Sequence, residues 1–208
     1  MTSSRHTSWK RIPPSETPSW GTLPWGAPPW GVPFAPALAE IQVSLMQGDI
    51  HCSADPKVLV TVLGSCVAVC LWDKARGIGG MNHFVLPSDR NGEKSTRYGD
   101  VAIDELEAGL VRLGCRITDL QAKVFGGAAV LPFAGGQTVG SNNVQLALER
   151  LRRDRIRITA QRTGGTVGQQ IRFHTRTGEV FVRYIPAGVR GKGLQDVVDL
   201  TREDGFVT

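Results

Sequence analysis

The sequence predicts one α+β domain built as a sandwich, with a tail at each end. Three observations support this fold class. Short Val-rich runs typical of strands recur between residues 38 and 186, and two amphipathic helical stretches interrupt them. Two helices are too few for the strict βαβ alternation of a parallel α/β fold. The stretch from 38 to 186 is also long enough to bury one hydrophobic core.

The strands are predicted from apolar runs and from alternation. Residues 58–63 and 66–72 are Val-rich runs on either side of a Gly-Ser break, which is the pattern of buried strands. Three further runs are expected to form strands: 78–86, 120–127 and 155–161. Residues 171–185 predict a hairpin that turns at Thr177–Gly178, because a Thr-Gly pair between two apolar runs is a turn signal.

The two helices are predicted from apolar positions that recur every three or four residues. Asp100 is expected to cap the first helix, and Gly114 is expected to end it as the C′ residue. Ser141 or Asn142 is expected to cap the second helix. The inward positions of the two helices would be Ile103, Leu106, Leu110, Leu113, Val144, Leu148 and Leu151.

The predicted tails, residues 1–37 and 187–208, differ in composition from the domain. In the first tail WGTLP, WGAPP and WGVPF repeat with a period of five residues from Trp20 to Phe34. Proline cannot donate a backbone hydrogen bond, so we expect this segment to be disordered. It is either a docking peptide that presents its Trp side chains, a dispensable tail, or the product of an overlong gene start. The second tail is polar and is expected to be loosely attached.

Composition excludes several classes of protein. No run approaches the roughly 18 apolar residues of a membrane span, so we expect no membrane insertion. The N-terminus also lacks the apolar core of a secretory signal. The cysteines, at positions 52, 66, 70 and 115, form no CxxC pair and no zinc-finger spacing. We therefore expect free thiols, no metal site and a cytoplasmic protein.

The chain is basic, with a net charge of +5, and its densest basic stretch is residues 149–162. This stretch is a nucleic-acid patch, a docking face for an acidic partner, or a solvated helix end and strand face. No recognised nucleic-acid module accompanies it, and aromatic residues are not interleaved with it. We therefore expect no nucleic-acid partner.

Cys66 follows Gly64 and Ser65 at the start of a predicted strand, and His83 lies in the next strand. Buried cysteines are often small core residues, and the spacing alone does not exclude that role. The alternative is a nucleophile with His83 as its base, because antiparallel pairing of the two strands would bring the side chains together. No helix N-terminus follows Cys66, so an imidazolium partner would have to lower its thiol pKa. Backbone N–H groups at Cys66 and its neighbours would then hold the oxyanion.

Two motifs, TVLGSCVAVCLWD at 61–73 and GGMNHFVLP at 79–87, closely resemble the chemoreceptor glutamine deamidase family, CheD. Further blocks match in the same order: RYGDVAIDEL, LQAKVFGGAAVL, VGSNNVQLALERL, RTGG and TGEVFVRYI. The resemblance covers residues 38–186 and leaves both tails uncovered. It favours a catalytic role for Cys66 and His83 over a structural one.

The resemblance implies hydrolysis of selected glutamine side chains on methyl-accepting chemotaxis receptors, without a metal or cofactor. Cys66 matches the family's nucleophile and His83 its general base, and Thr61 matches a third residue whose hydroxyl would orient the imidazole. The candidate substrate and oxyanion region consists of Gly64, Ser65, Asn82, Lys123, Gly126 and Gly127. The implied fold is a layered α/β/β/α sandwich resembling bacterial toxin-type cysteine deamidases.

The implied partners are the cytoplasmic helices of chemoreceptors, and some members of the family also bind a CheC-type phosphatase. An alternative function is therefore an adaptor that binds that phosphatase or the receptor without catalysis. Hydrolysis of receptor methyl esters is a further alternative, since the same thiolate could attack an ester. Gln169 and Gln170 stand where many relatives have basic residues, which puts the receptor specificity in question. The basic stretch 149–162 could compensate for them.

Overall fold

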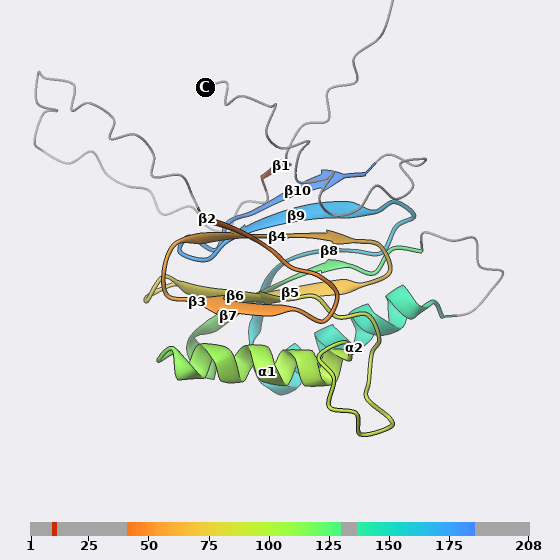
Figure 1. The fold of residues 1–208 in the computed structure, drawn as a ribbon, viewed down its shortest axis with the longest axis horizontal. Coiled ribbons are helices and arrows are strands. Elements are labelled where there is room, and N and C mark those ends of the chain that lie inside the picture. The colour runs from red at the N-terminus through yellow and green to blue at the C-terminus, as the bar shows by residue number, and fades with distance from the viewer. Residues whose placement is uncertain (1–9, 12–40, 130–136, 186–208) are drawn as a thin grey trace, which may run out of the picture.

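Two five-stranded sheets lie face to face, and two helices pack against the outer face of one of them (Figure 1). The structure, a computed structural model, describes residues 10–11, 41–129 and 137–185. The mixture of two sheets with helices confirms the predicted α+β class. Within the described residues the layers are helix, sheet and sheet, so a second helical layer over the other sheet is not among them. The likeness to toxin-type deamidases stays a prediction.

The first sheet has the strand order β1-β10-β9-β4-β2. Its strands are β1 (Lys10–Arg11), β2 (Ile41–Ser44), β4 (Lys57–Leu63), β9 (Gln169–His174) and β10 (Val180–Tyr184). β2 is parallel to β4, and the other neighbours are antiparallel. β9 and β10 form the hairpin that the sequence predicts, and Gly178 in its turn has a φ of 69°.

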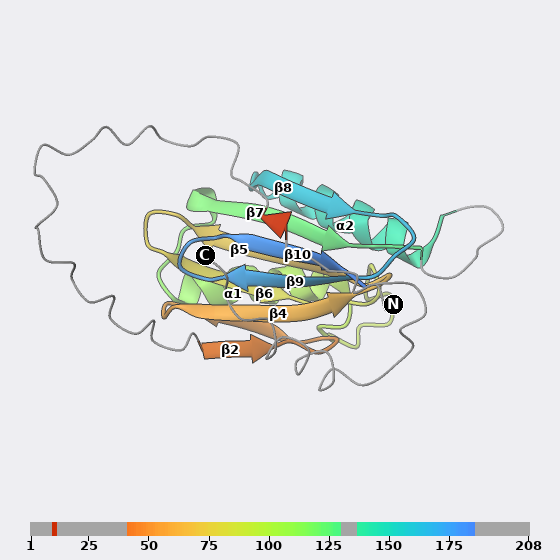
Figure 2. The same cartoon turned by 90° about the horizontal axis from the view of Figure 1, so that it is seen from above.

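The second sheet has the strand order β3-β6-β5-β7-β8 and lies beneath the first, with its strands nearly aligned (Figure 2). Its strands are β3 (Ile50–Ser53), β5 (Val67–Asp73), β6 (Ile78–Asn82), β7 (Leu120–Gly126) and β8 (Arg157–Thr163). β7 and β8 are parallel, and the other neighbours are antiparallel. The strand predicted at 78–86 is shorter than expected, because regular pairing ends at Asn82.

The predicted tails lie almost entirely outside the described residues. Lys10–Arg11 are described, and they pair with Val182 and Phe181 at the edge of the first sheet. The boundaries predicted for the domain, 38 and 186, and the role of the Trp-containing repeat stay predictions.

The helices are α1 (Gly99–Arg112) and α2 (Val139–Arg153), with a short 3₁₀ turn, η1 (Ile117–Asp119), before β7. Both predicted N-caps are wrong, by two residues for α1 and by three or four for α2. Tyr98 precedes α1 without a side-chain cap, and Asp100 lies inside the first turn, where its carboxylate faces the positive end of the helix. Thr138 caps α2 by accepting a hydrogen bond from the Ser141 N–H at 3.1 Å. No helix in the described part of the chain is long and apolar enough to span a membrane.

Two hydrophobic cores explain why the central strands are apolar on both faces. The helix-side core lies between the helices and the second sheet, and the inter-sheet core lies between the two sheets. Side chains of a strand alternate between faces, so Val67, Val69 and Leu71 of β5 enter the helix-side core. Ala68 and Cys70 point the other way, into the inter-sheet core, and Cys66 shares their face.

The basic stretch 149–162 extends over the second half of α2 and β8, and several of its charges have internal partners. The Arg150 guanidinium bonds the carboxylate of Asp104 on α1 and that of Asp154. The Arg162 guanidinium donates to the Tyr184 hydroxyl at 2.6 Å and lies 5.4 Å from the centre of its ring. Arg150 therefore links α2 to α1, and Arg162 links β8, at the edge of its sheet, to β10.

Glu107 of α1 makes the stability depend on pH. Its side chain is buried against α2, and burial, reinforced by the nearby Asp154 carboxylate, raises its pKa from 4.5 to about 7. Between those two values the folded chain holds a proton that the unfolded chain releases, so stability falls as the pH rises through this range. Glu107→Gln should remove this dependence and increase the free energy of unfolding above pH 7 by on the order of 1–3 kcal/mol.

Urea unfolding of both proteins between pH 5 and pH 9 measures this difference. Glu105 lies on the exposed side of the same helix, so Glu105→Gln is the matched control and should leave the pH dependence unchanged. A Glu107→Gln curve parallel to the wild-type curve at every pH would contradict the expectation.

Candidate active site

Cys66 lies at the bend between β4 and β5, and His83 follows the last residue of β6. The antiparallel pairing of β5 with β6 is extended beyond the end of β6 by one isolated bridge. In this bridge Val67 and Phe84 exchange backbone hydrogen bonds of 3.1 and 3.0 Å. In this register Cys66 is the diagonal cross-strand neighbour of His83, a relation that places Cβ atoms somewhat less than about 7–8 Å apart. Both side chains are buried, with 7% and 2% of their surface exposed. The antiparallel approach expected from the sequence is therefore present.

Thr61 reaches the same site from the other sheet. Its hydroxyl donates to the Leu45 carbonyl at 2.8 Å and lies 2.8 Å from His83 Nδ1. A hydroxyl has one hydrogen, so with that hydrogen given to Leu45 it must accept a hydrogen bond from Nδ1–H. This places the imidazole lone pair on Nε2, which is buried and has no hydrogen-bond partner among the described residues. Residues from both sheets thus position the imidazole, with Nε2 left without a partner among the described residues.

The backbone of His83 is held by the turn of residues 45–49, which connects β2 to β3 and is called the 45–49 turn below. The His83 N–H donates to the Asp49 carbonyl at 3.0 Å, and the His83 carbonyl accepts from the Gly48 N–H at 2.7 Å. The turn itself is closed by the Asp49 carboxylate, which accepts from the Met46 N–H at 2.7 Å. The imidazole is therefore fixed at its main chain as well as at Nδ1.

The electrostatics favour a neutral thiol and a neutral imidazole in the resting site. Burial raises the pKa of the Cys66 thiol, against smaller lowering effects from its own backbone N–H and from Arg97. Burial lowers the pKa of His83, against raising effects from the Leu45 carbonyl and Asp49. The imidazolium that the sequence analysis expects beside the thiol is therefore not the favoured resting form. Proton transfer has to accompany the attack instead.

Asn143 joins the loop of Cys66 to the loop of His83. It lies on the buried face of α2, and its Nδ2 donates to the Ser65 carbonyl at 3.1 Å and to the Val85 carbonyl at 2.7 Å. Sequence analysis did not select it. The available signal was a polar residue four positions before Ala147 and eight before Leu151, on the apolar stripe of the helix.

Gly64, Gly126 and Gly127 support the Cys66 loop through their backbones. The Gly64 carbonyl accepts from the Ala128 N–H, and the Cys66 carbonyl accepts from the Gly127 N–H, both at 2.8 Å. Gly126 has a φ of 104°, and a Cβ at this position would collide with the Cys66 carbonyl. These glycines therefore lie beside Cys66, and only glycine allows this approach at position 126. Their role in an oxyanion site stays a prediction.

Asn82 and Lys123 lie within the protein framework. Asn82 is fully buried, and its Oδ1 accepts from the Val69 N–H at 2.8 Å. Lys123 is paired with Cys70, three residues along β7 from Gly126, and its ammonium donates to the Gly178 carbonyl at 2.7 Å. The structure does not bring Lys123 together with Cys66, because its ammonium is engaged at the β9–β10 turn.

Gln169 and Gln170 are both buried in β9. The Gln169 amide donates to the Arg162 carbonyl at 3.1 Å, and the Gln170 side-chain oxygen accepts from Arg183 at 2.8 Å. The first contact joins β9 to β8 of the other sheet, and the second joins β9 to β10. A consequence for receptor specificity stays a prediction.

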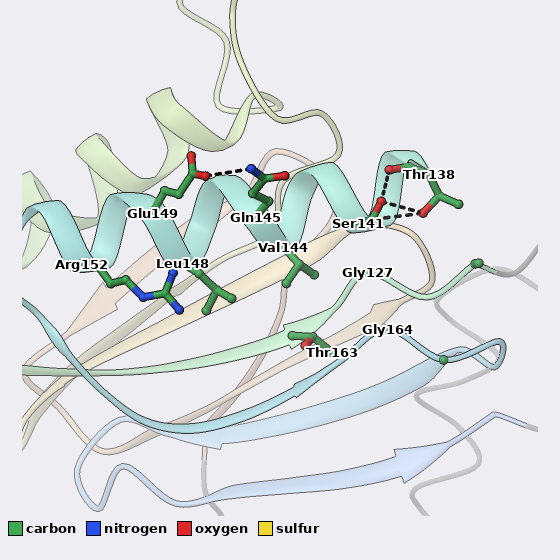
Figure 3. Close-up of a pocket in the computed structure, with 12 residues that line it drawn as sticks. Gly127, Thr138, Ser141, Val144, Gln145, Leu148, Glu149, Arg152, Thr163 and Gly164 are labelled. Atoms are coloured by element: carbon green, nitrogen blue, oxygen red, sulfur yellow. Dashed lines mark hydrogen bonds between the residues drawn. The ribbon is translucent and has the colours of Figure 1, made fainter. Parts of the chain in front are cut away.

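A groove of about 440 Å³ adjoins the Cys66 loop through Gly127 (Figure 3). Val144, Leu148 and Arg152 of α2 point into it, above the ends of β7 and β8. At the same end as Gly127, Thr138 and Ser141 bond one another at the start of α2. Its lining contains neither Cys66 nor His83, so the groove is a neighbour of the site and not part of it.

Comparison with known proteins places the chain in a family. The family model described as "CheD chemotactic sensory transduction" matches residues 85–184. A Rhodospirillum rubrum protein named "Probable chemoreceptor glutamine deamidase CheD" is 56% identical over 146 residues, covering 70% of this chain and 83% of that protein. An Anaeromyxobacter dehalogenans relative, "Probable chemoreceptor glutamine deamidase CheD 1", is 47% identical over 145 residues, covering 69% and 85%.

A third relative, from Caulobacter sp., has the same name as the first and is 42% identical over 159 residues, covering 72% of this chain and 84% of its own. Among solved structures, one described as "Bacillus licheniformis hypothetical protein YfiH" aligns with a TM-score of 0.37 and 15% identity, over 65% of this chain and 60% of that one. That likeness is too weak to carry an argument. The sequence relatives are decisive, and together with the family model they show that this chain belongs to the CheD family.

Proposed function

We propose that this protein deamidates glutamine side chains of chemoreceptors, giving glutamate and ammonia, with Cys66 as the nucleophile. One observation carries the proposal. In a chain whose relatives are named chemoreceptor glutamine deamidases, a thiol lies diagonally across the strands from a histidine. Thr61 holds Nδ1 of this histidine, and its Nε2 has no hydrogen-bond partner among the described residues. This is the arrangement of a nucleophile, a base and an orienting group.

In the proposed first half-reaction, Cys66 Sγ attacks the carboxamide carbon of the receptor glutamine, and the thiol proton moves to His83 Nε2. The imidazolium that forms donates from Nδ1 to Thr61, whose own hydrogen points to the Leu45 carbonyl. This relay aligns two dipoles with the new positive charge. His83 then returns the proton to the amide nitrogen, ammonia leaves, and a thioester remains on Cys66.

In the second half-reaction, water gives a proton to His83 Nε2 and attacks the thioester carbonyl. The carbon–sulfur bond breaks, the proton returns to Cys66, and glutamate is released. The net reaction adds one water and releases one ammonia, and it needs no group from outside the chain. In the proposed setting the protein acts in the cytoplasm on the cytoplasmic helices of the receptor.

The test is peptide mass spectrometry of a receptor cytoplasmic fragment incubated with the protein. Conversion of glutamine to glutamate at defined positions is expected with the wild-type protein and not with Cys66→Ala. Conversion by both proteins, or by neither with a cognate receptor fragment, would overturn the proposal. Binding of a CheC-type phosphatase stays a prediction, and retention of that binding by Cys66→Ala would show that it is separable from catalysis.

Thr61→Val should lower the rate of deamidation by roughly 10²-fold, at the lower end of what a general base contributes. Valine has a similar shape but no hydroxyl, so His83 Nδ1 and the Leu45 carbonyl lose their shared partner. The tautomer with its lone pair on Nε2 is then no longer enforced. Thr61→Ser keeps the hydroxyl and is the matched control, expected within a few-fold of wild type. Steady-state rates on the receptor fragment decide, and equal activity of the valine and wild-type proteins would exclude the orienting role.

A further inference from the structure

Gln47 is the polar side chain that reaches the sulfur of Cys66. It lies in the exposed 45–49 turn, and its side-chain Nε2 is 3.8 Å from Cys66 Sγ. No motif marked this residue in the sequence, because it lies 19 positions before Cys66 and belongs to the other side of the site. This contact places a carboxamide donor beside the proposed nucleophile.

The position of Gln47 is set by the same turn that holds the base. Gly48, the next residue, has a φ of 90° and donates its N–H to the His83 carbonyl at 2.7 Å. On the other side, the Leu45 carbonyl accepts from Thr61. Gln47 thus lies between two residues that contact the base and its orienting group, so its side chain is placed relative to His83 as well as to the sulfur.

We propose that Gln47 is a catalytic residue that donates a hydrogen bond to the oxyanion of the tetrahedral intermediates, and this inference rests on the proposed function. When Sγ bonds to the carboxamide carbon, the carbonyl oxygen becomes negatively charged one bond away from that carbon. A donor already in contact with Sγ lies close to that oxygen. An amide NH₂ is also neutral, so it stabilises the oxyanion without competing with His83 for the thiol proton.

A second donor is the backbone N–H of Cys66 itself. This N–H lowers the pKa of the Cys66 thiol, against the larger raising effect of burial. Two donors from different parts of the chain, one main-chain and one side-chain, would hold the oxyanion between them. Gln47 adds a side-chain donor to the backbone amides expected from the sequence, and it was not among the residues assigned to the substrate and oxyanion region.

The experiment separates stabilisation of the oxyanion from activation of the nucleophile. Gln47→Ala and Gln47→Glu are assayed for deamidation of the receptor fragment and for alkylation of Cys66 by iodoacetamide, located by peptide mass spectrometry. Alkylation proceeds by displacement at a saturated carbon and forms no oxyanion. We expect kcat to fall by about 10²–10³-fold in both variants with KM changed little. The alkylation rate of Cys66 should stay near the wild-type value in Gln47→Ala, whereas the negative charge of Gln47→Glu beside the sulfur should also slow alkylation.

Met46→Ala is the matched control, because the Met46 side chain is 51% exposed on the same turn, and it should leave both rates unchanged. Wild-type kcat in Gln47→Ala would overturn the inference while leaving the proposed function intact. Parallel loss of deamidation and alkylation in Gln47→Ala would also overturn it, because Gln47 would then act on the thiol. Failure of the wild-type protein to deamidate any cognate receptor fragment would instead be a failure of the proposed function.

Discussion

Replacing Cys66 by serine is expected to lower the rate of receptor deamidation by on the order of 10⁴-fold or more. Serine differs by one atom and should fit the same buried position. Its hydroxyl is a much weaker acid than a thiol, and burial lowers the pKa of His83, which makes the imidazole a weaker base still. The base that can take a proton from sulfur would therefore be unable to take one from oxygen.

The measurement is the initial rate of glutamate formation on the receptor fragment, with thermal unfolding of each variant to show that the fold is intact. Cys52→Ser is the matched control. The Cys52 thiol lies against α1, where it donates to the Leu106 carbonyl at 3.7 Å, and a serine hydroxyl can keep that contact. Comparable activity of Cys66→Ser and wild type would exclude Cys66 as the nucleophile.

His83→Gln is expected to lower the rate by roughly 10²–10⁴-fold, the usual contribution of a general base, and to change the pH profile. The base works only while Nε2 is unprotonated. Burial lowers the pKa of His83 below 6.5, so the wild-type rate should hold as the pH falls through 6.5 and decline only below it. The residual rate of the glutamine variant should lack this acid limb.

Values of kcat/KM measured between pH 5 and pH 8 report the ionisation of His83 in the free protein. His51→Gln is the control, since His51 lies on β3 beside Lys57 and outside the site. An acid limb centred above pH 6.5 in the wild-type protein would contradict the effect of burial. The same limb in His83→Gln would assign it to another group.

The elements with strong patterns were predictable from the sequence. The Val-rich runs became β4 and β5 because strands buried on both faces are apolar throughout. β2 and β3 were missed, because they are four residues long and at most partly buried except at Ser53, so neither shows a clear apolar period. The predicted helix starts were also wrong. Several residues near each start could cap the helix, and the local backbone geometry determines which of them does.

For the site, the motif around Cys66 and the strand pairing to His83 could be anticipated from one stretch of chain. Asn143 and Gln47 could not, because their partners lie 78 and 19 positions away and no local pattern records such contacts. Lys123 shows the opposite error. It belongs to the same matching motif as Gly126, three residues away. In a strand, three residues span about 10 Å, so Lys123 lies away from the site and its ammonium reaches the β9–β10 turn.

The sequence by itself determined the fold class, the order of the main strands and helices, and the presence of a thiol and an imidazole on neighbouring strands. These follow from local periodicity and from motifs, which adjacent residues encode. Only the tertiary structure decided that Thr61 accepts from His83 Nδ1, that burial keeps the resting pair neutral, and that a turn from outside the motif brings Gln47 to the sulfur. Hydrogen bonds between sheets and the removal of water depend on how distant segments pack, and no single stretch of sequence carries that information.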